Sequence, residues 1–363
     1  MRKENISGMA RADLTAAVDT TAVGRRDFLL RTAAVAGGTL ALTAGGVHTA
    51  SAKTVLRFGH EVPVTTAAGQ MYQHFADRVS ERTQGEVVIE VSPGAQLGSE
   101  AEMIEQAKNQ IIDMVEASMG GLGILVPALE MSEAPFLWDS WYEFSAVVRG
   151  PAFQPLWDEL EAKHNLIPMT KVWYWGWRNF TTRSKPVRSP ADLKGLKMRV
   201  PEAPVWVEMM KAVGASPTVI PFNDVYTALQ QKVVDGEENP VPVIYGQKFY
   251  EVNPFITLDR HMLTSLPIFI NKNSLTKIEP RHQVVIFEEA ESATAMNTVL
   301  QMRRDSLMLE KMKQSPGVQI IEEVDRAPFV EAMQPVYDNL KDRWGADNLE
   351  RVKAAIAEIH KYE

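Results

Sequence analysis

The chain has 363 residues, of which 45% are hydrophobic and 23% charged, so it is long enough for two globular domains. Its formal net charge of −8 disfavours binding to nucleic acid or to an anionic membrane surface. The chain contains no cysteine, which excludes disulfide bonds, thiol nucleophiles, cysteine metal sites and lipid attachment through cysteine.

The first 52 residues are typical of an export signal and not of a folded domain. The run 24–30 (GRRDFLL) fits a twin-arginine motif, a mildly apolar stretch follows it, and residues 50–52 (ASA) fit the small-x-small cleavage pattern. We predict cleavage near Lys53, export to the periplasm and no stable membrane insertion afterwards. The alternative is an uncleaved anchor, because the apolar run could cross ~30 Å of hydrocarbon. Arg31 and several glycines weigh against that alternative.

From Lys53 onward the sequence alternates between strand and helix patterns. Glu61 and Ser118 each follow a predicted strand, which is where α/β sheets bind ligands. Either side chain could instead cap a helix or lie on the surface. The apolar periodicity predicts strands at 53–59, 86–91 and 113–117 and helices at 66–83, 99–111 and 151–163.

Residues 171–178 (KVWYWGWR) predict an aromatic strand. Because alternate side chains of a strand share a face, Trp173, Trp175 and Trp177 should lie on one side and Arg178 on the other. Core packing is the interpretation we favour for at least two of the tryptophans, and Trp173 is the candidate to face a ligand. Arg178, at the strand end, is a candidate cation. Gly176 leaves room for a ligand or for a neighbouring backbone.

The stretch 192–240 predicts a βαβα unit, the kind of unit that builds sheets with ligands at the strand ends. Arg199 lies where its first strand stops before Pro201. A guanidinium is permanently charged and forked, so it suits bidentate binding of a carboxylate, although a solvated or salt-bridged arginine is the alternative. The unit consists of a strand at 197–200, a helix at 205–213 closed by Gly214, a strand at 218–220 and a helix from Asn223 to Gly236.

One long helix dominates the last third of the chain. Its pattern runs from Pro280 to about residue 313, before Pro316-Gly317, so it would span ~50 Å at ~1.5 Å per residue. A helix of that length can run along two lobes. The remaining pattern predicts a helix at 245–250, strands at 255–261, 265–270 and 318–323, and helices at 328–343 and 348–361.

Nothing in the sequence indicates catalysis. No histidines are paired at helical spacing, and no GxSxG elbow occurs. The adjacent acids Glu237 and Glu238 are interpreted as a solvated turn. We therefore predict no catalytic residues, no cofactor and no metal site.

The segments DLKGLKMRVPEAPVWVEMMKAVGA and VYTALQQKVVDGEENP resemble the solute-binding proteins of TRAP (tripartite ATP-independent periplasmic) transporters, the DctP family. The likeness extends over residues 53–363. It implies an α/β, two-lobed fold like that of periplasmic binding proteins, with a ligand cleft between the lobes and a long helix spanning both. Lobe I would comprise residues 53–176 with 264–303, and lobe II residues 177–263 with 304–363. The membrane subunits of the transporter are the implied partner.

The same resemblance assigns ligand-binding positions. Arg199 matches the family's carboxylate-binding arginine, and Arg178 matches a second arginine that assists it. Further ligand positions fall on Asn239, Phe222, Glu61 and Ser118; a core aromatic is the alternative for Phe222.

The expected ligand is a small organic acid. A Glu61 carboxylate facing it would repel a second carboxylate but accept hydrogen bonds from hydroxyls, and tryptophan faces suit a sugar ring. We therefore expect a hydroxylated monocarboxylate such as a uronate or an aldonate. The alternatives are a C4-dicarboxylate or keto acid, a periplasmic enzyme acting on an organic acid, or the ligand domain of a sensor.

Overall fold

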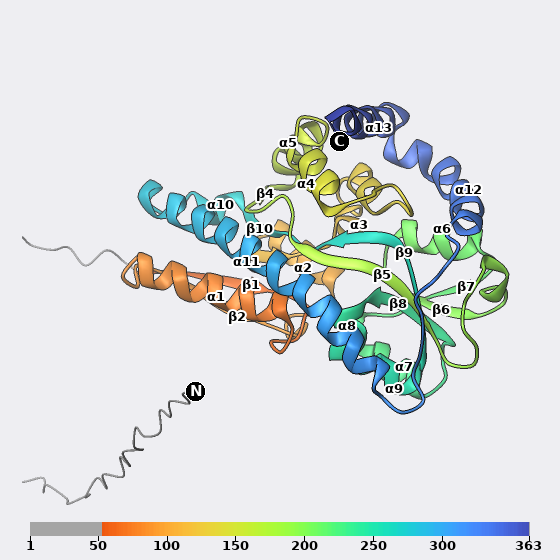
Figure 1. Ribbon diagram of the computed structural model, residues 1–363. Coiled ribbons are helices and arrows are strands. Elements are labelled where there is room, and N and C mark those ends of the chain that lie inside the picture. Colours follow the sequence, from red (N-terminus) through yellow and green to blue (C-terminus); the bar gives the residue numbers. More distant parts are fainter. Residues whose placement is uncertain (1–52, 363) are drawn as a thin grey trace, which may run out of the picture. The chain divides into compact units, whose positions relative to one another are not determined.

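The computed structural model describes residues 53–362, so the predicted export signal and its cleavage site lie outside the described residues. Two β-sheets with helices packed on them make up this part of the chain (Figure 1). The predicted α/β class is confirmed. Among residues 53–362, none of the helices combines the length and the apolar character that crossing a membrane requires.

The first sheet has five strands in the order β2-β1-β3-β10-β4. The strand β1 pairs in parallel with β2 and β3, so their carboxyl ends meet at one edge. Helix α1 covers this sheet and buries Tyr72, Phe75 and Val79, and a capping box at Ser99 starts α2. The bounds are β1 (Thr54–Gly59), α1 (Ala67–Arg82), β2 (Val87–Ser92), α2 (Glu100–Lys108), β3 (Met114–Glu116), β4 (Leu166–Pro168) and β10 (Ile268–Asn271).

The second sheet has six strands in the order β11-β9-β5-β8-β6-β7. The predicted βαβα unit supplies β6, α6, β7 and α7, and the apolar positions that predicted α6 are buried. The bounds are β5 (Tyr174–Thr182), β6 (Lys197–Val200), α6 (Pro204–Ala212), β7 (Ser216–Val219), α7 (Val225–Gln230), β8 (Gly236–Pro240), α8 (Val241–Gly246), α9 (Phe249–Val252), β9 (Phe255–Ser265) and β11 (Gln319–Ile321).

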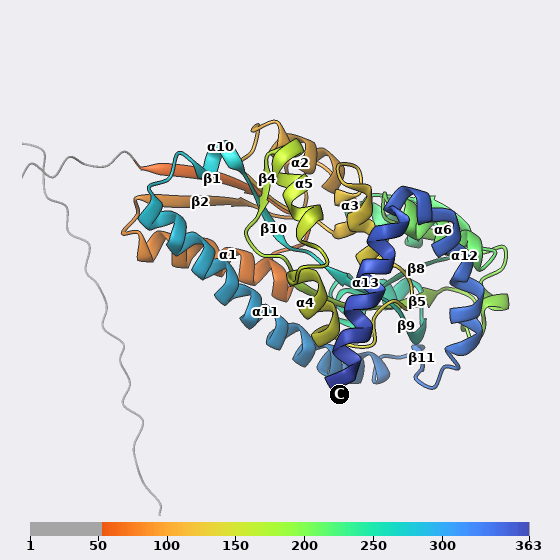
Figure 2. The same ribbon diagram turned by 90° about the horizontal axis from the view of Figure 1, so that it is seen from above.

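The chain passes between the two sheets three times. It goes from β4 to β5, from β9 to β10, and then along the long helix α11 (Pro280–Lys313). This helix has the bounds that the sequence predicts and packs on α1 at one end and on α8 and β5 at the other. Figure 2 shows α11 running beside α1 and on past the second sheet.

The C-terminal helices contact both groups of elements. Helix α12 packs on α6 of the second group, whereas α13 packs on α4, which lies between β3 and β4 in the chain. The Nε of Arg351 on α13 donates to the carbonyl of Ala152 at 2.8 Å. The remaining helices are α3 (Met119–Leu122), a 3-10 helix (Pro127–Glu133), α4 (Trp141–Arg149), α5 (Gln154–His164), α10 (Lys272–Leu275), α12 (Ala327–Trp344) and α13 (Ala346–Ile359).

Two local predictions in the βαβα unit are wrong. Asn223 does not cap α7; its side-chain amide donates to the carbonyl of Gly94 at 3.0 Å, and α7 ends at Gln230, short of Gly236. Glu237 and Glu238 do not form a solvated turn, because they lie in β8 and are fully buried. β8 is an interior strand of its sheet, and neither carboxyl group is accessible to solvent.

Candidate functional site

A cleft lies where strand ends of the first sheet meet strands of the second. Six of the seven predicted ligand-binding residues line it together, and an adjoining hollow shares Glu61, Arg199 and Phe222. The cleft is lined by Glu61, Glu100, Ser118, Trp175, Arg178, Arg199, Pro201, Trp206, Phe222, Asn239, Thr264 and Leu266.

Local structure explains how the predicted residues arrive there. Glu61 follows β1, and Ser118 follows the parallel neighbour β3, where its hydroxyl caps α3 by accepting from the N–H of Gly121 at 2.9 Å. Arg199 is the last but one residue of β6. Asn239 in β8 donates from its amide to Glu237 at 2.6 Å. The expectation that strand ends gather polar side chains therefore holds for these four residues. Arg178, which the sequence predicts at a strand end, lies instead in the middle of β5.

Arg178 belongs to a buried chain of charges. Its Nη2 donates to Oε1 of Glu238 at 2.8 Å and to the Glu238 carbonyl at 2.7 Å. His261 lies between Glu238 at 3.2 Å and Asp259 at 2.9 Å, and stacks on Phe180 with ring centroids 4.4 Å apart. We call Arg178, Glu238, His261 and Asp259 the Arg178 quartet; all four are at most 3% exposed.

Opposite charges within the quartet act against the cost of burial. Burial opposes the positive charge of Arg178, but its ion pair with Glu238 outweighs burial and raises the pKa of Arg178. Burial also opposes the charge of His261, yet Asp259 and Glu238 raise its pKa to about 9. Burial raises the pKa of Asp259, whereas for Glu238 the charges of Arg178 and His261 outweigh burial and lower the pKa.

Within residues 53–362, Arg199 lacks an ion-pair partner of the kind that Arg178 has in Glu238. It is 3% exposed, and its Nε donates to the carbonyl of Ile220 at 2.9 Å. Across residues 53–362 no carboxylate oxygen lies within 4.0 Å of its nitrogens. Burial, and then repulsion from Arg178, lower its pKa to about 10, which still leaves it charged at neutral pH. A buried charge without a partner is costly, so an anion that enters the cleft gains most at this guanidinium.

The opposite wall carries carboxyl groups. Burial raises the pKa of Glu61 to about 8, and the neighbouring Glu100 adds to this shift. Burial also raises the pKa of Glu100 itself. Behind them, Glu116 accepts from the backbone N–H of Glu61 at 3.1 Å, and burial raises its pKa well above the usual range. Glu61 is therefore mainly protonated at neutral pH and can donate as well as accept a hydrogen bond, which the expectation of a Glu61 carboxylate did not anticipate.

The structure does not bring the seventh predicted residue, Trp173, to the cleft. Its indole is fully buried and stacks on Tyr72, with ring centroids 4.5 Å apart. Trp175 lines the cleft instead, edge-on to Phe222 at 6.5 Å. Trp173 and Trp175 still pack in one hydrophobic cluster, as the alternation predicts, whereas Trp177 packs against the other cluster with Tyr174, because the register of β5 shifts between Tyr174 and Gly176 and Gly176 has a φ of 135°.

Sequence reasoning also missed Glu100 and Trp206. Trp206 lies in the first turns of α6, and the guanidinium of Arg178 lies 5.3 Å from its ring centroid. Glu100 is the first residue of α2 and accepts from the backbone N–H of Ser118. Both stand in the first turn of a helix that follows a strand, α2 after β2 and α6 after β6. That position is the sequence signal that could have identified them.

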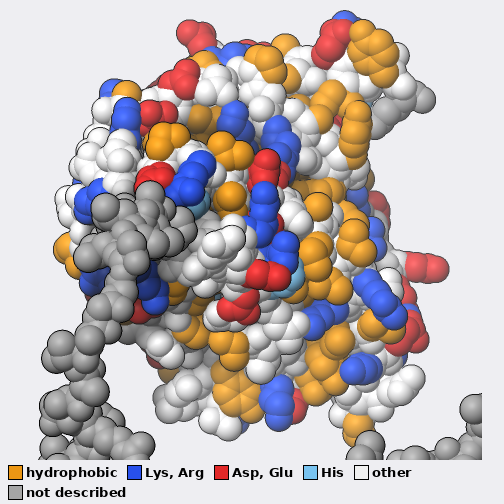
Figure 3. All heavy atoms as spheres, turned by 90° about the vertical axis from the view of Figure 1, so that its left-hand side faces the viewer, with side chains coloured by type: hydrophobic (Ala, Val, Ile, Leu, Met, Phe, Trp, Pro, Cys, Tyr) orange, Lys and Arg blue, Asp and Glu red, His pale blue; other side chains and the backbone are white. Residues whose placement is uncertain are grey.

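Charges outside the cleft are mixed in sign. Figure 3 shows Lys and Arg side chains interspersed with Asp and Glu over one face of the molecule. Two groups of His, Asp and Glu in residues 53–362 have ligand atoms close enough to hold a metal ion, and neither includes a residue of the cleft. The absence of a metal or cofactor requirement stays a prediction. The two groups are Glu86, Glu279 and His282, and Asp139, Glu143 and His360.

The known sequences that this chain matches include bacterial solute-binding proteins. The family model for bacterial extracellular solute-binding proteins, family 7 (DctP), matches residues 58–343. A 2,3-diketo-L-gulonate-binding periplasmic protein of Escherichia coli is 31% identical over 278 residues, which make up 77% of this chain and 84% of the relative. A C4-dicarboxylate-binding periplasmic protein of Rhodobacter capsulatus is 29% identical over 330 residues, or 90% and 98% of the two chains.

Comparison with solved structures agrees in fold. A TRAP periplasmic solute-binding protein from Xanthobacter autotrophicus with bound β-D-galacturonate is 30% identical, with a TM-score of 0.76 over 82% of this chain and 99% of that one. A TRAP periplasmic solute-binding protein from Sulfurospirillum deleyianum with bound succinate is 29% identical, with a TM-score of 0.79 over 84% and 99%.

Proposed function

Because the chain belongs to family 7 of the bacterial extracellular solute-binding proteins, the DctP family of TRAP solute receptors, we propose that it captures a sugar acid through Arg199. The ligand is a hydroxylated monocarboxylate such as a uronate or an aldonate. Its carboxylate lies against the guanidinium of Arg199, and Asn239 and Arg178 complete the same wall. Glu61, Glu100 and Ser118 bind its hydroxyls from the other wall.

One observation carries this proposal: Arg199 is buried and charged, without a carboxylate partner in residues 53–362, whereas Arg178 beside it is paired with Glu238. The cleft therefore offers one cation for one carboxylate. A second ligand carboxylate would face Glu61 and Glu100, and an anion placed there would compete with their own ionisation. Hydroxyls suit these two groups better, since a carboxyl group both donates and accepts hydrogen bonds.

The aromatic side chains support a ring-shaped ligand. Trp175, Trp206 and Phe222 bring apolar faces to the cleft, which suit the C–H face of a sugar. The similarity to a galacturonate-bound structure and to a diketogulonate-binding protein favours the same class. The similarity to succinate-binding and C4-dicarboxylate-binding proteins makes a dicarboxylate the alternative.

Capture couples to closure in this proposal. Lobe I comprises residues 53–176 with 264–303, and lobe II comprises residues 177–263 with 304–363. The ligand docks on Arg199 of lobe II, and Glu61 and Ser118 of lobe I then close over it, excluding water and strengthening the ion pair. The packing of α13 on α4 adds a contact between the lobes that closure has to accommodate.

Export and delivery complete the proposed role. The family consists of binding receptors, and we assign no catalytic step to this chain. A twin-arginine-type signal in residues 1–52 would bring the protein to the periplasm, where the closed form docks on the TRAP membrane subunits. Gene neighbours that encode a small and a large membrane subunit would favour transport over sensing.

Isothermal titration calorimetry with a matched panel tests the ligand class. The panel contains D-galacturonate, D-galactonate, succinate, malate, pyruvate and neutral D-galactose. We expect at least one of the two sugar acids to bind with one-to-one stoichiometry and galactose, which lacks the carboxylate, not to bind measurably. Tight binding of succinate or malate without sugar-acid binding would discard the preference for monocarboxylates. Steady consumption of the bound acid would show an enzyme instead.

A further inference from the structure

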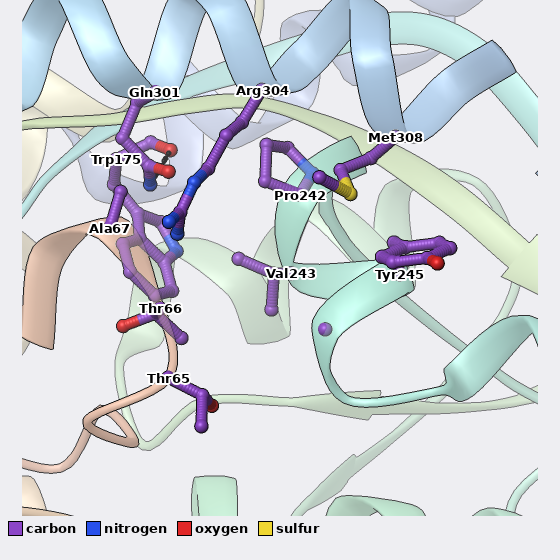
Figure 4. A pocket seen from close by; sticks show the side chains of 11 residues that line it. Thr65, Thr66, Ala67, Trp175, Pro242, Val243, Tyr245, Gln301, Arg304 and Met308 are labelled. Carbon is purple, nitrogen blue, oxygen red and sulfur yellow. Dashed lines mark hydrogen bonds between the residues drawn. The ribbon is translucent and has the colours of Figure 1, made fainter. Parts of the chain in front are cut away.

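A second cavity lies on the other side of Trp175 from the centre of the cleft. Its volume is about 240 Å³, and Trp175 is the only residue it shares with the cleft lining. Figure 4 shows side chains converging on it from the start of α1, from α8 and from α11. The cavity is lined by Thr65, Thr66, Ala67, Trp175, Pro242, Val243, Tyr245, Gly246, Gln301, Arg304 and Met308.

The charged lining of this cavity has one sign. Arg304 extends from α11 into the space between Trp175 and Val243 (Figure 4), and the lining contains no Asp or Glu. Its Nη2 donates to the side-chain oxygen of Gln70 at 2.9 Å, and no carboxylate oxygen of residues 53–362 lies within 4.0 Å of the guanidinium. The net charge of the chain is −8, so a cation that faces a cavity and has no acidic partner in its lining makes this place locally favourable for an anion.

The rest of the lining indicates the charge, polarity and size of a molecule that would fit the cavity. The amino end of the 16-residue helix α1 opens on the cavity at Thr66 and Ala67, and the helix dipole adds partial positive charge there. Apolar surface comes from Trp175, Val243 and Met308. The volume corresponds to about eight water molecules at ~30 Å³ each, so the occupant is a small molecule.

We propose that this cavity is a second binding site, separate from the cleft, for a small monoanion with an apolar body, of which an aromatic monocarboxylate is the simplest example. The carboxylate pairs with Arg304 and faces the start of α1, and the ring packs between Trp175, Val243 and Met308. The site draws on elements packed with both sheets and on the long helix that joins them, so its occupant holds these elements together. This inference goes beyond the proposed capture of a sugar acid and does not depend on it.

Titration with benzoate tests the proposal, with benzyl alcohol as the uncharged analogue of similar size. We expect the wild-type protein to bind benzoate at least about tenfold more tightly than benzyl alcohol. Only the carboxylate of benzoate can form a hydrogen bond with Arg304 in which both groups are charged. Arg304→Gln should weaken benzoate about tenfold. Arg303→Gln changes an exposed neighbour on the same helix and should leave benzoate unaffected.

A second variant fills the cavity without removing any polar contact. At Gly246, which lines the cavity, an added Cβ meets no heavy atom within 4 Å, so Gly246→Leu should fold and should also weaken benzoate about tenfold. Circular dichroism melting checks both variants. Arg199→Ala keeps benzoate binding if the two sites are separate, and Arg304→Gln keeps galacturonate binding.

Three results would overturn the inference. The first is the absence of benzoate binding to the wild-type protein, and the second is a benzoate affinity in both Arg304→Gln and Gly246→Leu that equals that of the wild-type protein. The third is loss of benzoate binding in Arg199→Ala with retention in Arg304→Gln, which would place benzoate in the cleft. A protein that binds benzoate as expected but no sugar acid would contradict only the proposed function.

Discussion

Arg178 in the middle of β5 and Arg199 near the end of β6 are both 3% exposed and both line the cleft, yet their surroundings differ. Arg178 forms a bidentate contact with Glu238, which His261 supports from the other side. Arg199 makes a single contact to a backbone carbonyl. Burial alone therefore does not distinguish the two cations; the presence of an ion-pair partner does. In the proposed function, Arg178 holds the wall of the cleft together and Arg199 binds the ligand.

Replacing Arg199 is expected to have the largest effect on binding. Arg199→Ala removes the partner of a buried ligand carboxylate, which costs ~3–5 kcal/mol, or more than about a hundredfold in affinity. Arg199→Lys should recover only part of the loss, because an ammonium cannot match a carboxylate with a planar fork. Calorimetry with the sugar acid that binds best gives both values, and circular dichroism confirms folding.

The control for this prediction comes from the long helix. Arg303 is exposed on α11 and lines neither cavity, so Arg303→Ala should change affinity by less than about twofold. Arg304 is unsuitable, since it lines the second cavity. Equal losses in Arg199→Ala and Arg303→Ala would contradict the assignment of Arg199 as the anchor.

Glu238→Ala tests the role of Arg178 and is expected to lower the stability of the protein. It leaves Arg178 and His261 buried without their shared carboxylate, which costs ~3–5 kcal/mol in the free energy of unfolding. Urea unfolding of the ligand-free protein measures this loss. Glu208→Ala breaks a partly exposed pair with Lys211 and should cost less than ~1 kcal/mol. If the two variants lose the same stability, the Arg178 quartet does not hold the wall.

The pH dependence of stability separates the Arg178 quartet from the wall of the cleft that carries Glu61 and Glu100. Burial raises the pKa of Glu61 from 4.5 to about 8, so the folded protein binds a proton that the unfolded chain releases. This contribution to stability is fully present below about pH 4.5 and is lost as the pH rises to about 8. Glu237, whose pKa burial raises to about 7, acts in the same direction.

The quartet adds to this trend at higher pH. The charge of His261 is stabilised up to about pH 9, so its contribution is lost as the pH rises from about 6.5 through 9. We therefore expect the urea midpoint to fall continuously between about pH 5 and 9, and Glu61→Gln to flatten the fall between about pH 5 and 8. Affinity for a sugar acid should also drop above about pH 8, where Glu61 ionises beside the ligand. An unchanged slope in Glu61→Gln would contradict the raised pKa.

Sequence patterns predict well what depends on neighbouring residues. Arg199, Glu61 and Ser118 were predicted because each lies at or just after the end of a strand, and α11 was bounded by Pro280 and the Pro316-Gly317 pair. The burial of Glu238 could not be predicted in this way, because its partner Arg178 is 60 residues away. The packing of α13 on α4 likewise depends on contacts between distant segments.

The nine residues of β5 also show a feature that sequence patterns do not predict. A regular strand would put Trp173, Trp175 and Trp177 on one face, but the register shift between Tyr174 and Gly176 turns Trp177 to the other hydrophobic cluster. The family resemblance supplied the identity of the site residues, but it could not show which arginine is already paired. The contact between Arg178 and Glu238 makes that distinction.

The smallest predicted effect concerns these two tryptophans. Trp175→Ala removes an aromatic face from the cleft and should weaken sugar-acid binding several-fold, since an aromatic contact contributes ~0.5–1.5 kcal/mol beyond its buried area. Trp173→Phe keeps the stack on Tyr72 and should leave affinity within about twofold, while lowering the urea midpoint slightly because the core is less well filled. Calorimetry and urea unfolding of both variants separate a cleft residue from a core residue. A larger loss of affinity in Trp173→Phe than in Trp175→Ala would contradict the assignment of Trp175, and not Trp173, to the cleft.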